Sequence, residues 1–175
     1  MKDNTLYGLI AATWAIVGVS LLLLNAIFRL SNIAWELTEY SLSWYHWMIL
    51  GLNLIFMAYS EGYKGFQLKF APRFAARCLY LRRNPRALHA LLAPLFCMGF
   101  FHTTRKRKVI TFTITLTIIG FIQIAHLLQQ PWRGILDAGV VLGLTWGLLS
   151  TYYYLQKAFN DNTFNHTPEL PAGYR

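Results

Sequence analysis

The residues best suited to chemistry are arginines and lysines gathered in one stretch of the chain. Residues 61–108 contain eleven of the 16 basic residues and one acid, Glu61. Planar guanidinium groups match the oxygens of phosphate and of lipid headgroups, whereas lysine offers a single point of charge. The sequence therefore predicts a site for an anionic lipid or another phosphate-bearing ligand, formed by Lys64, Lys69, Arg73, Arg77, Arg82, Arg83 and Arg86.

A second set of polar residues lies within long apolar segments. His46 and Asn53 fall in one such segment, and Gln123 and His126 fall in another. Polar groups at membrane depth normally face other helices or a watery path. The set therefore indicates hydrogen bonding between two spans or, alternatively, a transport path between them. Because two histidines on two helices can also ligate a b-type haem, a haem-bearing subunit is a further alternative. No other cofactor and no metal site is expected.

These residues are carried by a strongly apolar chain of 175 residues. It is 55% hydrophobic and only 13% charged, whereas a soluble domain carries about 25% charged residues. A helix needs about 20 apolar residues to cross a bilayer, and segments 6–28, 44–60, 109–129 and 135–154 meet or approach that length. The sequence therefore predicts an all-α polytopic membrane protein with four transmembrane helices in a single domain, 1–175.

A fifth apolar run, 87–101, is too short to be a fifth span. Its fifteen residues would reach only about 22 Å, and Pro94 interrupts the helical hydrogen bonds. Basic clusters flank it on both sides, so a crossing would carry one of them through the bilayer. We therefore expect a re-entrant or interfacial helix.

The connecting segments are expected at the membrane surface. Segments 29–43 and 72–83 have one apolar face each, which predicts amphipathic surface helices, the second of them basic. The glycines in 61–69 indicate a chain that leaves the bilayer and turns along it, with Glu61 paired to Lys64 or an arginine. The polar tail, 160–175, is expected to be flexible.

The distribution of charge predicts the orientation. Because basic residues stay on the cytoplasmic side, segment 61–108 and both termini should be cytoplasmic. Trp44, Trp47 and Trp132 would then lie at the outer surface, where indole rings favour the headgroup layer. The expected location is a cell membrane, most simply a bacterial inner membrane.

Three glycines recur at every fourth position of the last span: Gly139, Gly143 and Gly147. Small residues in this register let another helix approach closely. Ala11 and Ala15 of the first span offer a partner within the same chain, and a homo-oligomer is the alternative.

Motifs for catalysis are missing from the sequence. There is no P-loop, zinc-protease motif or nucleophile elbow, and Cys78 and Cys97 are expected to be free, buried thiols. Glu61, Tyr63 and His102 could supply acid–base groups for a lipid-headgroup enzyme. The sequence favours a non-enzymatic role instead: a membrane protein that binds anionic phospholipid within a membrane assembly and does not bind nucleic acid.

Overall fold

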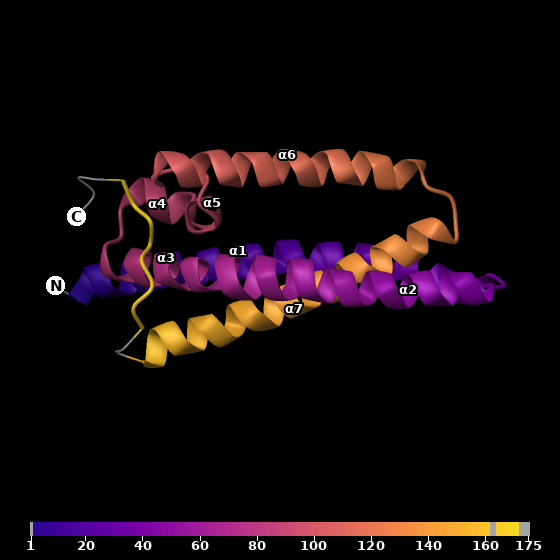
Figure 1. Cartoon of the computed structure of the whole chain (residues 1–175). Coiled ribbons are helices and arrows are strands. Elements are labelled where there is room, and N and C mark those ends of the chain that lie inside the picture. The colour runs from indigo at the N-terminus through magenta and orange to yellow at the C-terminus, as the bar shows by residue number, and fades with distance from the viewer. Residues whose placement is uncertain (1, 162–163, 172–175) are drawn as a thin grey trace.

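The computed structural model describes residues 2–161 and 164–171, and every regular element in those ranges is a helix (Figure 1). The elements in chain order are α1 (Lys2–Trp35), η1 (Glu36–Glu39), α2 (Trp44–Met57), η2 (Ala58–Phe70), α3 (Ala71–Arg83), α4 (Ala87–Leu91), α5 (Ala93–Met98), α6 (Arg105–Leu127) and α7 (Trp132–Asn160).

Three helical segments are long and apolar enough to cross a membrane: Leu6–Glu39, which joins α1 to η1, then α6 and α7. The all-helical prediction is therefore confirmed, and the chain has the helices of a membrane protein. The expected span 44–60 corresponds to α2, which at 14 residues is too short on its own.

The first helix continues well past the end of the first apolar run. Arg29 to Trp35 belong to α1, and only the 3-10 turn η1 follows before the chain becomes extended at Tyr40. The expected surface helix over 29–43 is therefore wrong. No glycine or proline occurs between Gly18 and Gly51, so nothing in the sequence breaks the helix near Phe28.

α2, η2 and α3 form one continuous helical rod from Trp44 to Arg83. The residues at its two junctions, Ala58 and Ala71, both keep right-handed helical dihedral angles. The expectation that the chain turns along the membrane after Glu61 is therefore wrong. Gly62 serves packing instead, since a Cβ there would lie 2.9 Å from the Trp146 ring of α7.

The middle of the rod, η2, is a π-helix that ends just before Pro72. The N–H of Ala71 donates to the carbonyl of Phe66, five residues back, as in a π-helix. Proline lacks an N–H, and its ring clashes with the preceding turn of an ordinary α-helix. The wider turn ahead of Pro72 lets the helix continue through it.

α3 belongs to the core of the bundle. Phe74, Cys78 and Leu81 are buried, but so are residues around the rest of the helix, including Ala71, Ala75 and Arg77. Its buried apolar residues pack with others from α1, α5 and α7. The expected surface helix over 72–83 is a helix, but its place on the membrane surface is wrong because its alanines let α1 and α7 close over it.

The fifth apolar run folds back on itself. It forms the short helices α4 and α5, and Gly99 ends α5 with a left-handed φ of 91° that favours glycine. The Nε1 of Trp14 in α1 donates to the carbonyl of Leu91 at 3.4 Å, and the Pro94 ring lies against Gly18. The run enters and leaves at the same end of the bundle (Figure 1).

In the tail expected to be flexible, residues 164–171 form hydrogen bonds to the loop before α6, whereas 162–163 and 172–175 lie outside the described residues. Residues 164–171 run from the end of α7 toward the start of α6 (Figure 1). The carbonyl of Glu169 accepts from the N–H of Thr104 at 3.2 Å and from the hydroxyl of Thr103 at 3.1 Å. Composition did not reveal this, because the partners lie more than 60 residues away.

α6 lies along the outside of the bundle (Figure 1). From residue 112 to 124 every side chain is exposed except Thr115, which is partly buried. Its buried residues, Thr111 and Ala125, lie toward the two ends. Most of its apolar surface is therefore left for contacts outside this chain.

Candidate functional site

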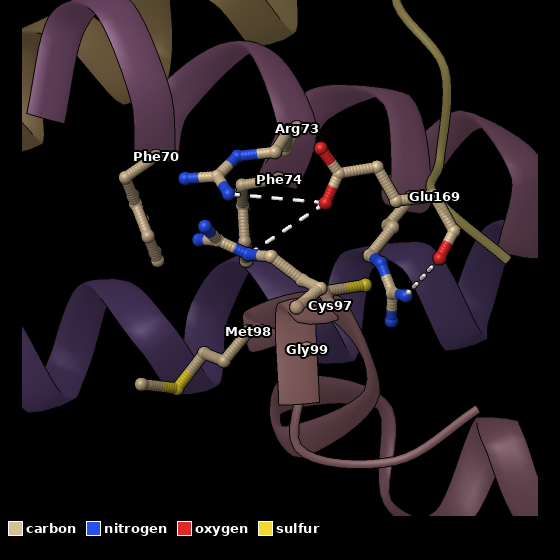
Figure 2. Close-up of a pocket in the computed structure, with 9 residues that line it drawn as sticks. Phe70, Arg73, Phe74, Cys97, Met98, Gly99 and Glu169 are labelled. Carbon is tan, nitrogen blue, oxygen red and sulfur yellow. Dashed lines mark hydrogen bonds and ion pairs between the residues drawn. The ribbon is translucent and has the colours of Figure 1, made fainter. Parts of the chain in front are cut away.

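Three arginines from two helices converge at the end of the bundle that carries α4 and α5. Arg73 and Arg77 come from α3, and Arg107 comes from the first turn of α6. They line a small pocket closed by the tail residue Glu169 (Figure 2). Its volume is about 10 Å³, the room that one water molecule needs. The full lining is Phe70, Arg73, Phe74, Arg77, Cys97, Met98, Gly99, Arg107 and Glu169.

Arg77 is a structural residue whose hydrogen-bonding capacity is filled. Its side chain is buried, with 3% of the residue exposed, and all five N–H donors of the guanidinium can be assigned to backbone carbonyls. The acceptors are those of Pro168 at 2.9 Å, Phe96 at 2.6 Å, Phe101 at 3.5 Å, His102 at 3.2 Å and Glu169 at 3.4 Å. Arg77 therefore has no N–H donor left over for the anionic ligand that the sequence predicted.

The charge of Arg77 is kept despite its burial. Burial lowers the pKa of the Arg77 guanidinium, while the nearby Cys97 and Glu169 side chains act in the opposite direction. An arginine starts from so high a pKa that it stays protonated. Arg77 therefore ties α3, α5 and the tail together as a cation among carbonyl oxygens.

Arg73 and Arg107 hold the carboxylate of Glu169 between them. An Oε2–Nη1 distance of 3.9 Å joins Glu169 to Arg73, and an Oε2–Nε distance of 3.7 Å joins it to Arg107 (Figure 2). Both distances exceed those of hydrogen bonds. The arginine side chains are 19% and 17% exposed and that of Glu169 is 35% exposed. Two guanidinium groups thus share one loosely held carboxylate.

The other residues of the predicted anion site are spread along the rod and beyond it. The Nζ of Lys64 lies over the Tyr59 ring, 4.6 Å from its centroid, and the Arg82 guanidinium lies 5.2 Å from the Phe159 ring centroid. Lys69, Arg83 and Arg86 are exposed. Of the seven predicted residues only Arg73 and Arg77 line the pocket, and Arg107 was missed because its sequence position suggested a flank of the third span.

Next to Arg77, two histidines join α4 to the loop before α6. The Nε2 of His89 lies 2.9 Å from the Nδ1 of His102, and the buried His89 ring stacks on Phe96 with centroids 4.3 Å apart. Burial, followed by the charges of His102, Arg86 and Arg77, lowers the pKa of His89 to about 4. His89 is therefore neutral at ordinary pH.

The three residues that the sequence suggested for acid–base chemistry, Glu61, Tyr63 and His102, do not lie together. His102 bonds to His89, whereas Glu61 lies in η2 against Gly143 of α7, and Tyr63 is exposed. The lipid-headgroup enzyme therefore lacks a common site for these three residues.

The two cysteines lie together in the core. The Sγ atoms of Cys78 and Cys97 are 3.6 Å apart, and both thiols are buried and free. Burial, reinforced by the hydrogen bond to Cys97 and its charge, raises the pKa of the Cys78 thiol. A thiol in this state is a poor nucleophile.

The polar residues of α2 face α7. The His46 ring lies 5.1 Å from the Trp132 ring, and the Nδ2 of Asn53 donates to the carbonyl of Ile135 at 2.7 Å. Gln123 and His126 are exposed on α6. α2 packs on α7, so the structure does not bring the four polar residues of the predicted path together.

Neither the haem alternative nor a metal site gains support from the histidines. The Nδ1 of His46 accepts from the N–H of Ser43 at 3.1 Å, and the Nδ1 of His126 lies 2.7 Å from the carbonyl of Ile122. Within residues 2–161 and 164–171, no group of three or more His, Cys, Asp or Glu side chains is placed to hold a metal ion.

The three glycines of α7 are buried against the rod. A Cβ built on Gly139 would meet Asn53, and one on Gly147 would meet the Phe66 ring. At Gly143 it would lie 3.0 Å from the Oε2 of Glu61. The helices that pack against these glycines are therefore α2 and η2.

No protein-family model, curated protein or solved structure matches this chain.

Proposed function

We propose that this is an integral membrane protein that binds the headgroup of an anionic phospholipid between Arg73 and Arg107 at its cytoplasmic face. The observation that carries the proposal is the pair of guanidinium groups that share the Glu169 carboxylate at 3.7 and 3.9 Å. A phosphate group brings more oxygens than a carboxylate and can take a fork of N–H donors from each arginine.

The proposed arrangement has four spans: α1, the apolar part of the rod, α6 and α7. Two observations support it. α1 begins, and residues 164–171 lie, at the same end of the bundle (Figure 1), as an even number of spans requires. That end also carries most of the basic residues of segment 61–108, and such a charge bias favours a cytoplasmic location for it.

The depth of the pocket favours a lipid over a soluble phosphate. Arg107 lies in the basic run Arg105–Lys108, immediately before the apolar part of α6. Such a run marks the headgroup layer, where each cation near an anionic leaflet contributes about 1 kcal/mol. A headgroup at this level would reach Arg73 and Arg107 while its acyl chains lie along α6.

Native mass spectrometry of the purified protein tests the proposal. Replacing Arg73 and Arg107 by lysine keeps the charge but removes both guanidinium forks. Co-purified anionic phospholipid should fall in this variant and stay unchanged in the matched control, Arg82→Lys with Arg83→Lys. Equal retention in the two variants would reduce the region to a non-specific basic surface.

Cysteine labelling tests the orientation separately. With Cys78 and Cys97 replaced by alanine, a cysteine introduced by Asn84→Cys should resist an impermeant reagent added to intact cells. Labelling from outside would overturn the cytoplasmic assignment.

A further inference from the structure

Glu61 lies against the middle of α7. Glu61 belongs to the first turn of η2. A Cβ built on Gly143 would lie 3.0 Å from the Oε2 of Glu61 and 3.1 Å from the Cβ of Glu61. Gly143 is the central member of the glycine series, so the carboxylate reaches the helix backbone with no side chain between them.

In the proposed four-span arrangement, on which this inference rests, the contact lies near mid-membrane depth. Gly143 stands 11 residues after Trp132 and 11 before Tyr154, about 16 Å from each at 1.5 Å per residue. Those aromatic residues bracket a length close to the roughly 30 Å of a bilayer core. On the rod, Glu61 precedes Arg73 by 12 residues, and Arg73 lies at the level of the basic first turn of α6.

Among the described residues, no cation is paired with this carboxylate. Over residues 2–161 and 164–171, no hydrogen bond or ion pair to the Glu61 side chain is present, and the Nζ of Lys64 lies over Tyr59 instead. The charged residues of α7 lie toward its ends, with Arg133 and Asp137 3.7 Å apart in a pair of their own and Lys157 near the other terminus. An ionised carboxylate without a partner is costly at membrane depth, whereas the protonated acid is neutral.

We propose that Glu61 is an intramembrane proton-binding site. It holds its proton while η2 and α7 are closed together and transfers it to water when water reaches the carboxyl group, leaving the carboxylate. The surroundings suit such a change, since π-helical geometry is frequent at functional sites and the glycines of α7 place no side chains against η2. The site is independent of the lipid site at Arg73 and Arg107.

Infrared spectroscopy in dodecyl maltoside, a detergent without carbonyl groups, tests the proposal. A protonated carboxyl group has a carbonyl stretch above the amide I band. At neutral pH this band should be present in the wild type, shift in D₂O and disappear reversibly at high pH. It should be lost in Glu61→Gln and kept in the matched controls Asp137→Asn and Glu169→Gln. A wild type without the band, or a band lost in Asp137→Asn but kept in Glu61→Gln, would overturn the assignment.

A second measurement needs no variant and so does not depend on whether Glu61→Gln folds. Dicyclohexylcarbodiimide partitions into apolar regions and adds to protonated carboxyl groups, and the adduct rearranges to a stable N-acylurea with no group lost. After treatment of native membranes at neutral pH, peptide mass mapping should find the adduct on Glu61, less of it as the pH rises. Adducts confined to other carboxyl groups would contradict the proposal.

Discussion

α7 and α6 are both apolar helices of spanning length, yet one is enclosed by the chain and the other is left open. Gly139, Gly143 and Gly147 of α7 each meet a side chain of the rod, whereas a Cβ on Gly120 of α6 would meet nothing within 4 Å. Hydropathy therefore identifies both helices as spans, but small residues in register decide which one the rest of the bundle closes upon.

The same contrast holds among the arginines at the end of the bundle. On the enclosed side, every N–H of Arg77 can be matched to a carbonyl oxygen. On the open side, Arg107 of α6 has one distant carboxylate, at 3.7 Å. A buried side chain whose hydrogen-bond donors are all paired within the protein has none left for a ligand. A ligand site is therefore expected where a side chain is held in place but still has unpaired donors.

The largest expected effect comes from Arg77→Leu. It removes the donor from one buried and four partly buried carbonyls. Since each unsatisfied buried group costs about 1–3 kcal/mol, stability should fall by about 3 kcal/mol or more. The matched change on the open helix, Lys106→Leu, should stay within about 0.5 kcal/mol. Denaturant unfolding in detergent measures both, and equal losses would mean that Arg77 does not hold this end together.

Gly147→Leu should have the next largest effect. Its side chain would collide with the Phe66 ring, and overpacking of this kind costs about 1–3 kcal/mol. Gly120→Leu is the control with open space around it and should lower the unfolding midpoint little. If both variants unfold alike, the difference between the enclosed and the open helix does not exist in solution.

The sequence predicted much of the open helix and less of the enclosed region. The apolar run after Lys108 and its basic flank were enough to place a span at 109–129, where α6 occupies Arg105–Leu127. The rod could not be predicted, because a glycine such as Gly62 is equally compatible with a turn and with close packing against another helix. Only the position of Trp146 decides between these, and it depends on how α7 packs.

The candidate site was found in part for a similar reason. The cluster of arginines was visible in the sequence, but which of them is bonded internally depends on tail carbonyls more than 90 residues away. Such contacts are made by backbone atoms, which every residue has, so no residue type in the sequence predicts them. Arg107 and Glu169 were missed because neither lies near Arg73 in the chain.

Lowering the pH should loosen the enclosed end. The pKa of His89 is lowered to about 4, against about 6.5 when unfolded, so between these values the unfolded chain binds the extra proton. Stability should therefore fall as the pH is lowered from about 6.5 to about 4 and be retained above that range. His89→Phe should flatten the dependence of the melting temperature on pH, whereas His126→Phe on the exposed α6 should not. A wild-type melting temperature that stays level across this range would contradict the burial of a neutral His89.

The smallest effect on stability, and the sharpest test of Arg73 and Arg107, is expected from Glu169→Gln. The carboxylate is partly exposed and its two ion pairs are long, so its loss should cost under about 1 kcal/mol. The backbone bonds of Glu169 to Thr103, Thr104 and Arg77 are kept, so the tail should stay in place. Because the carboxylate occupies the position proposed for a phosphate, its neutralisation should increase the anionic phospholipid retained in native mass spectrometry, with no gain for zwitterionic lipid. Reduced retention would instead mean that Glu169 helps to arrange Arg73 and Arg107 for the ligand. The Glu169 carboxylate would then be part of the lipid site and not a competitor of the phosphate.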